Sequence, residues 1–364
     1  MPSLATCARG ATSLGQMPNP ALSEKRNQRI LSDVVRAYIE TGEPVSSRWI
    51  SRHSPEPLSP ATVRNVMADL EEEGYLFQPH TSAGRVPTPA AFQFYVQQLS
   101  AETPLPSSQQ DWIHAELARA STPAEVLERA CHVLAEMSHG LGIVIAPPLA
   151  RAVLEHIRFL LLPDGRILTV FISRGGQTLD KAIVTERALN QEELDRTADY
   201  LNRHYSGWAL DAIRADLLAQ IDRERQRYDR LVSNALLLCD PNVLAQDEKR
   251  ELYVEGAAQI AGAPEFAEPE AMRELLSAIE EKEKLVVLLT SCIETPDPVT
   301  IQIGVQGMRH AGARLAFIGA PYVTDGRAQG ALAVLGPMRM EYERAITAVA
   351  YLARLFNENS TRSS

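Results

Sequence analysis

The sequence predicts an α+β protein built from more than one domain. The chain has 364 residues, more than one hydrophobic core usually supports, which suggests two or three domains. Its N-terminal part combines helical patterns with two short extended segments, and its later part contains β-rich runs between helical stretches. Hydrophobic residues make up 45% of the chain, which is enough to form real cores.

The first elements are two short helices separated by a turn. An apolar stripe predicts the first helix, with members at Ile30, Leu31, Val34, Val35, Tyr38 and Ile39. Gly42 ends this helix, and Pro44 prevents it from restarting at once. Ser46 or Ser47 can cap a second helix that runs through His53. Two prolines then place residues 54–57 in a turn.

A third helix begins at Ser59 and Pro60, a capping hydroxyl followed by a proline at the first helical position. One face is apolar: Val63, Val66, Met67 and Leu70. Arg64 and Asn65 lie away from that face in the first turns. Arginine suits the hydrogen-bonding edge of guanine and asparagine that of adenine, so this helix is a candidate reader of DNA bases.

Two extended segments and a loop follow the third helix. Gly74 closes the helix, Tyr75–Phe77 starts the first segment, and residues 78–85 form the loop. Val86 starts the return, and Pro87 and Pro89 restrict it to a short edge strand. A fourth helix is indicated by Phe92, Tyr95, Val96 and Leu99.

This order of elements is typical of a winged helix-turn-helix that binds DNA. The predicted DNA-binding residues are Ser47, Arg48, Ser59, Thr62, Arg64, Asn65, His80, Thr81, Ser82 and Arg85. The alternative is a helix-turn-helix used only for scaffolding or protein docking. Charge does not decide between them, because residues 23–99 contain eight basic and nine acidic residues, whereas DNA-binding domains are usually basic.

The rest of the chain predicts a larger α/β body. Prolines and turn formers in residues 101–109 predict a linker, and helices are expected over 112–120 and 123–138. Residues 143–145, 156–162 and 167–173 read as strands of an antiparallel sheet.

Residues 190–239 are helical again. Asn190 with Glu193 begins one helix, and Gly207 stops it. A long amphipathic helix follows, with Ile213, Leu217, Ile221, Tyr228, Val232 and Ala235 on one stripe. This helix either packs on its own domain or forms a self-association surface. Four further strands are expected at 285–290, 300–304, 315–319 and 331–335, and a closing helix at 340–356.

No catalytic or metal-binding pattern emerges. His132, His139 and Cys131 share one predicted helix, but further ligands at standard spacing are missing from the sequence. No phosphate-binding glycine loop or nucleophile motif occurs, and the four cysteines form no CxxC pair. No run of about 18 apolar residues would span a membrane. We therefore expect a cytoplasmic protein that is not an enzyme, with no cofactor and no metal; its net charge of −10 favours solubility.

Three stretches of the N-terminal region resemble the HrcA family of heat-inducible repressors: ETGEPVSSRWIS, LSPATVRNVMADLEEEGYL and QPHTSAGRVPT. Near the C-terminus, ALAVLGPMRMEYERAI resembles that family's closing strand and helix, so the likeness covers roughly residues 22–358. It implies a homodimeric repressor of heat-shock chaperone operons. Such a repressor binds double-stranded DNA at a CIRCE-type inverted repeat, and the GroE chaperonin keeps it active.

The resemblance also implies a GAF-like α/β domain interrupted by a dimerising insert. The expected organisation is a disordered extension (1–21), a winged helix-turn-helix domain (22–100), a linker (101–109), a first GAF-like part (110–184), the insert (185–275), a second GAF-like part (276–358) and a tail (359–364).

Residues 1–21 have no counterpart in the family pattern, and Met17 is a candidate for the true start. Two alternatives stay open. One is a regulator whose GAF-like domain senses a metabolite, and the other is an enzyme with an appended helix-turn-helix.

Overall fold

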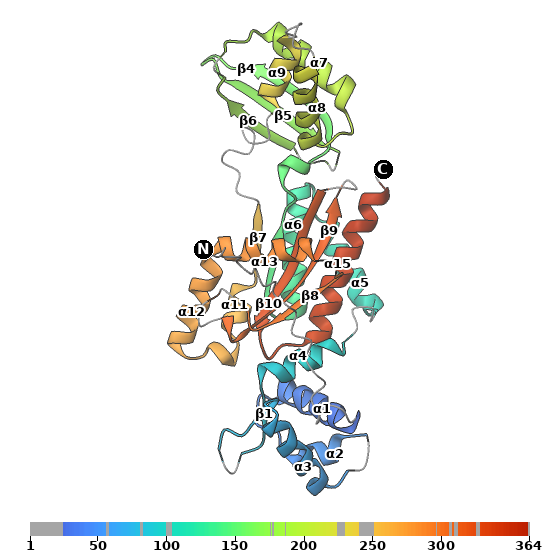
Figure 1. Ribbon diagram of the computed structural model, residues 1–364, viewed down its shortest axis with the longest axis vertical. Coiled ribbons are helices and arrows are strands. Elements are labelled where there is room, and N and C mark those ends of the chain that lie inside the picture. The colour runs from blue at the N-terminus through green and yellow to red at the C-terminus, as the bar shows by residue number, and fades with distance from the viewer. Residues whose placement is uncertain are drawn as a thin grey trace, which may run out of the picture. The chain divides into compact units, whose positions relative to one another are not determined.

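The computed structural model divides the chain into two compact units, Met1–Gln98 and Leu99–Ser364 (Figure 1). It describes residues 25–55, 58–80, 83–99, 104–174, 176, 178–185, 187–223, 230–239, 251–295, 297–305, 308, 312–324 and 328–362. Helices and antiparallel sheets occur together, so the predicted mixed α+β class is confirmed. The predicted extension 1–21 lies outside the described residues.

The first unit contains α1 (Lys25–Thr41), α2 (Ser47–His53), α3 (Pro60–Glu72), β1 (Leu76–Phe77), β2 (Val86–Pro87) and α4 (Pro89–Gln97). The apolar stripe expected on the first helix is the buried face of α1, with Ile30, Leu31, Val34 and Val35 at most 1% exposed. Gly42 ends α1 at a φ of 71°, a left-handed conformation that glycine adopts without strain.

The two short strands of the first unit pair antiparallel, Leu76 with Pro87 and Phe77 with Val86. An isolated bridge between Val45 and Arg85 extends this pairing to the segment between α1 and α2. The loop that connects β1 and β2 is therefore attached at its base to the helical part of the unit.

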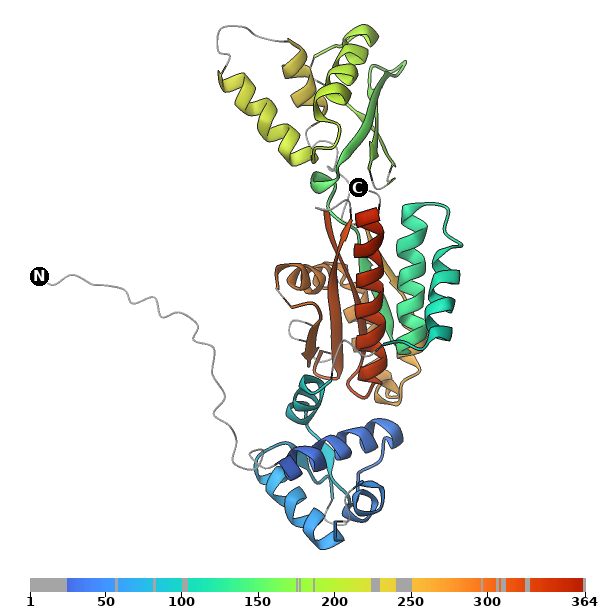
Figure 2. The same cartoon turned by 90° about the vertical axis from the view of Figure 1, so that its right-hand side faces the viewer.

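The second unit is built around a five-stranded antiparallel sheet of order β7-β3-β10-β9-β8. Its strands are β3 (Leu141–Ile145), β7 (Leu252–Glu255), β8 (Thr300–Ile303), β9 (Leu315–Thr324) and β10 (Ala328–Pro337). Figure 2 shows helices on both faces. One face carries α5 (Ser107–Leu117), α6 (Pro123–Ser138) and α15 (Tyr342–Arg362). The other carries α12 (Pro269–Glu280) and α13 (Lys282–Glu294), which share an apolar core with the sheet and with α11 (Ala257–Ala261).

A second core in this unit contains the three-stranded sheet β4 (Leu154–Leu161), β5 (Ile167–Ser173) and β6 (Thr178–Ile183). It packs against α7 (Gln191–Tyr205), α8 (Leu210–Arg223) and α9 (Arg230–Leu238). The predicted start of α7 at Asn190 is confirmed, and it is a capping box: the side chains of Asn190 and Glu193 each accept a backbone hydrogen bond from the other residue. We call this core, which extends from Ala152 to Cys239, the inserted module.

Several sequence predictions need correction. The strand expected at 285–290 is helix α13, because Leu285, Leu288, Leu289 and Cys292 bury one helical face. A short apolar run does not distinguish a buried strand from a buried helix. The long helix expected after Gly207 is two helices, α8 and α9. The helix expected from 112 begins at Ser107, inside the predicted linker.

The expected insert borders at 185 and 275 are also wrong. Residues 143–145 do not share a sheet with 156–162 and 167–173: β3 pairs with β7 and β10, whereas β4 and β5 belong to the inserted module. Residues 252–255 and the apolar residues from Ile260 to Leu275 belong to the central core. The module that interrupts the central sheet therefore starts near Ala152 rather than at residue 185.

Candidate nucleic-acid interface

Two serines set the starts of the second and third helices. The Trp49 backbone N–H donates to Ser46 Oγ at 3.2 Å, so Ser46 rather than Ser47 caps α2. The Thr62 N–H donates to Ser59 Oγ at 3.1 Å, and the two hydroxyls lie 2.9 Å apart. Ser59 and Thr62, both predicted DNA-binding residues, thus use part of their hydrogen-bonding capacity to fix the start of α3.

Helix α3 is divided into a buried and an exposed face. Val63, Val66, Met67 and Leu70 are at most 3% exposed. Arg64 and Asn65 are exposed on the opposite side, both just past the first turn of the helix. The structure thus brings the two base-reading candidates together on one accessible helix face. Asp69 and Glu72 lie further along that face, towards the C-terminal end.

Helix α2 supplies two further basic side chains. Arg48 and Arg52 are exposed, whereas Ser47 is half-buried. Trp49 and His53 stack along the helix with ring centroids 4.1 Å apart, a contact that the sequence analysis did not anticipate. Their spacing of four residues, which places them on one helix face, was the available signal.

Hydrogen bonds connect residues within the loop between β1 and β2. Gln78 Nε2 donates to the carbonyl of Ala83 at 2.8 Å, and the Ala83 N–H donates to the His80 carbonyl at 2.8 Å. His80 is exposed, as expected of a contact residue. The predicted contacts Thr81 and Ser82 lie outside the described residues. Sequence reasoning overlooked the role of Gln78 and the 46% exposure of Phe77.

Arg85, a predicted DNA-binding residue at the end of the loop, is largely buried. Its guanidinium forms an ion pair with Glu71 on α3, with an Nη2 to Oε2 distance of 2.7 Å, and its side chain is only 17% exposed. Its backbone N–H donates to Val45 at 2.8 Å, and its carbonyl accepts from Val45 at 2.9 Å. Arg85 is therefore held on both sides within the first unit.

The carboxyl group of Asp33, on α1, has a shifted pKa. Burial raises the pKa of Asp33 on α1, and the neighbouring Arg36 and Arg29 oppose part of that shift. Asp33 therefore favours its protonated form more than an exposed aspartate does.

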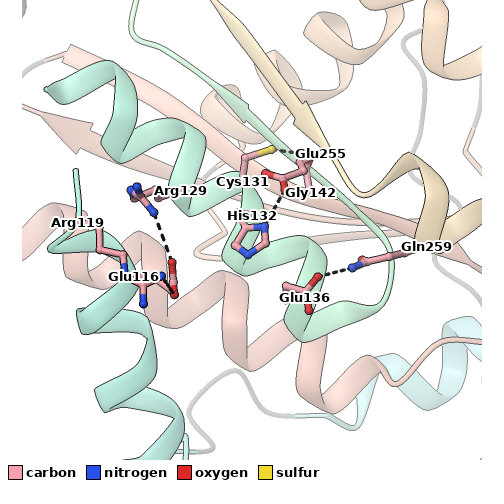
Figure 3. A network of polar contacts seen from close by, with 9 residues as sticks. All are labelled: Glu116, Arg119, Arg129, Cys131, His132, Glu136, Gly142, Glu255 and Gln259. Atoms are coloured by element: carbon pink, nitrogen blue, oxygen red, sulfur yellow. Dashed lines mark hydrogen bonds and ion pairs between the residues drawn. The ribbon is translucent and has the colours of Figure 1, made fainter. Parts of the chain in front are cut away.

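The second unit contains a polar network between α5, α6 and β7 (Figure 3). Glu116 lies 2.6 Å from Arg119 and 3.5 Å from Arg129, and His132 Nδ1 lies 2.7 Å from Glu255. Burial raises the pKa of Cys131 to about 12, and its thiol donates to the Gly142 carbonyl at 2.9 Å. A thiol in that state is a poor nucleophile and a poor metal ligand.

Histidines and cysteines do not converge on a metal site in the described part of the chain, where groups of three such ligands are absent. His139, the second histidine of the predicted pair, instead ends α6 in a left-handed conformation at a φ of 51°. Cys131, Cys239 and Cys292 are buried and free. None of the described helices is both long and apolar enough to cross a membrane.

Comparison with known proteins adds independent information. The family model "HrcA protein C terminal domain" matches residues 124–346. A heat-inducible transcription repressor HrcA of Geobacter sulfurreducens is 38% identical over 332 residues, which cover 91% of this chain and 96% of the relative. Its counterpart in Methylococcus capsulatus is 35% identical, with 92% and 95% covered.

Among solved structures, a hypothetical protein at 2.2 Å resolution aligns over 94% of this chain and 99% of its own, with a TM-score of 0.60 and 22% identity. That likeness supports the fold alone. The sequence matches extend over nearly the whole length of both chains, and on that basis the chain belongs to the HrcA family of heat-inducible transcription repressors.

Proposed function

We propose that the first unit is a winged helix-turn-helix and that α3 reads operator bases in the major groove of DNA. The observation that carries this proposal is the exposure of Arg64 and Asn65 on one face of a helix whose other face is fully packed. Both side chains have the donor and acceptor pattern needed for bidentate base contacts. Arg48 and Arg52 on α2 and His80 in the wing are then suited to phosphate contacts.

The target that best fits this family is a CIRCE-type inverted repeat upstream of chaperone operons, with the GroE chaperonin maintaining the active repressor. Relatives are named heat-inducible transcription repressors, which supports regulation by heat. In this proposal the protein acts by occupying DNA, not by catalysis, and the five-stranded sheet with its flanking helices is a GAF-like domain.

We also propose that the protein is a homodimer held through the inserted module. Helices α7 to α9 cover one face of the module's sheet. We call the opposite face the outer sheet face, and no described element packs on it. Its centre is apolar, with the side chains of Leu160, Leu168, Val170, Ile172 and Ala182. An antiparallel sheet that faces water normally carries polar residues there, so this composition indicates a covered surface.

The charges on the outer sheet face fit a second copy in one orientation. Arg158 on β4 and Asp180 on β6 flank Val170 in the same cross-strand row, and both are exposed. A two-fold axis parallel to β5 places β4 of one copy opposite β6 of the other. Each Arg158 then meets the partner copy's aspartate, whereas an axis across the strands would oppose like charges.

A footprinting experiment tests the proposed function. The full-length protein is titrated onto the promoter of the organism's chaperonin operon, with a scrambled repeat of equal length as control. Protection of both half-sites at a concentration that leaves the scrambled repeat unprotected supports the proposal. Equal protection of both sequences contradicts it.

A further inference from the structure

Arg85 joins three segments of the first unit. Its backbone forms two hydrogen bonds with Val45, which precedes α2, at 2.8 and 2.9 Å. Its side chain forms an ion pair with Glu71 in the last turns of α3 at 2.7 Å. In sequence it directly precedes β2, the return strand of the wing. Arg85 thus links the wing, the entry to α2 and the end of the candidate reader helix.

The side chain of Arg85 is largely buried beside Glu71. It is 17% exposed, its partner Glu71 is 33% exposed, and Arg85 Nε is buried without a hydrogen-bond partner in the described part of the chain. A guanidinium that contacts a DNA phosphate needs its donors in solvent before binding. Leaving the ion pair would also expose the Glu71 carboxylate without its partner, near the proposed DNA surface, where phosphates would repel it.

We propose that Arg85 and Glu71 form a clamp that holds the wing against α3, and that Arg85 is a positioning residue for operator binding rather than a DNA contact. This inference rests on the proposed DNA-binding function and adds the means by which the two DNA-facing elements keep a fixed geometry. Because binding by preorganised elements costs less ordering entropy, loosening the clamp weakens specific binding.

The sharpest test removes the acid. Replacing an acidic residue beside DNA lowers repulsion, so electrostatics alone predict unchanged or tighter binding by Glu71→Gln. The clamp predicts the opposite for specific DNA: a loss of about fivefold or more in operator affinity. Glu72→Gln is the matched control, because Glu72 is the adjacent exposed acid, without a side-chain partner in the described part of the chain. It is expected to leave operator affinity unchanged or slightly raised.

The salt dependence separates positioning from phosphate contact at Arg85. Operator affinity of the full-length protein is measured at several salt concentrations for the parent and Arg85→Ala. A lost phosphate contact lowers the slope of log affinity against log salt by about 0.9 per protomer. A positioning residue lowers affinity for the chaperone-operon repeat while the slope stays the same. A slope reduced by that amount overturns the clamp.

Exchanging the charges of Arg85 and Glu71 tests whether weaker operator binding comes from the lost ion pair or simply from misfolding. Arg85→Glu and Glu71→Arg are each expected to weaken operator binding, and the double exchange is expected to restore a large part of it. Circular dichroism melts identify any single variant that fails to fold, in which case the neutral variant at the same position, Arg85→Ala or Glu71→Gln, is used in its place. The clamp proposal is wrong if the single variants bind the operator as tightly as the parent. It is also wrong if the double variant has no higher operator affinity than the weaker single variant. Failure of the parent itself to prefer the operator overturns the proposed function instead.

Discussion

Gly84 lies against the backbone of Val45, where no side chain fits. A Cβ at position 84 would overlap the Val45 carbonyl oxygen and would stand 2.5 Å from the carbonyl oxygen of Pro44. This close approach allows Arg85 to form both of its backbone hydrogen bonds with Val45. The base of the wing therefore depends on a residue without a side chain.

Gly84→Ala is accordingly expected to destabilise the first unit by about 1–3 kcal/mol, because the backbone must move to admit the methyl group. Thermal unfolding measures this. Gly262→Ala is the control, since a Cβ there meets nothing nearer than 3.4 Å. If both variants melt at the parent temperature, the close packing of the wing base does not contribute to stability.

Arg64→Ala and Asn65→Ala should each weaken operator binding tenfold or more while leaving the melting temperature unchanged. Both side chains are exposed, so the fold does not need them, and a bidentate base contact is worth about 1–3 kcal/mol. Gel-shift titration measures the affinity. Glu72→Gln, at the far end of the same helix face, provides the control. Parent-like affinity of both alanine variants would assign base reading to another element.

Reversing one charge on the outer sheet face should disrupt the proposed dimer. Arg158→Asp and Asp180→Arg each create two like-charge pairs across a two-fold axis, so the dimer dissociation constant should rise about tenfold or more. The double reversal should restore dimerisation, because the opposite charges then face each other again.

Sedimentation equilibrium of the full-length variants measures this effect. Arg203→Asp is the control, because Arg203 is 77% exposed on α7, a helix on the covered side of the sheet. Single reversals that dimerise as tightly as the parent would place the dimer surface elsewhere.

Chaperonin is expected to raise the fraction of protein that binds DNA after a heat pulse. The central sheet requires β3 to pair with β10, Ile145 with Ala331, across the whole inserted module. Such non-local pairing folds slowly and exposes aggregation-prone edges. A tenfold rise in the competent fraction lowers the apparent Kd tenfold without any new contact.

The measurement is a gel shift after a heat pulse, with and without chaperonin and ATP, and ATP alone as control. Complete recovery without chaperonin would contradict the proposal that the GroE chaperonin maintains the active repressor. It would favour the alternative in which the GAF-like domain senses a metabolite.

Asp33→Asn should raise the melting temperature near neutral pH. The folded-state pKa of Asp33 is raised, so its contribution to stability is fully present below the unfolded pKa and is lost as pH rises through the folded pKa. The ionised carboxyl therefore costs stability at about pH 7, and the substitution removes that cost. Well below the ordinary aspartate pKa of about 3.9, the Asp33 carboxyl is protonated in the folded and the unfolded chain alike, so the difference from asparagine should disappear.

Thermal melts across this pH range measure the difference. Asp164→Asn is the control of opposite sign, because hydrogen bonds from Arg166 lower the Asp164 pKa. A parent that melts higher than Asp33→Asn at neutral pH would show that the arginines outweigh burial.

Local signals in the sequence were enough to predict several elements. Ser59 followed by Pro60 identifies the start of α3, Asn190 with Glu193 identifies the start of α7, and Gly42 identifies the end of α1. The accessible face of α3 with Arg64 and Asn65 was also predictable, because helical periodicity assigns each residue to a face. In each case the determining contacts lie within a few residues along the chain.

Tertiary structure alone decided the partner of Arg85, the sheet to which each strand belongs and the helical state of residues 282–294. Glu71 and Arg85 meet only after the wing has folded back onto α3, and β3 finds β10 only across the inserted module. A short apolar run packs equally well as a helix or a strand, so its state depends on the surface it meets. The sequence alone thus determined where the helices start and which face of α3 is exposed. Long-range packing decided how the wing attaches to α3 and which strands form each of the two cores.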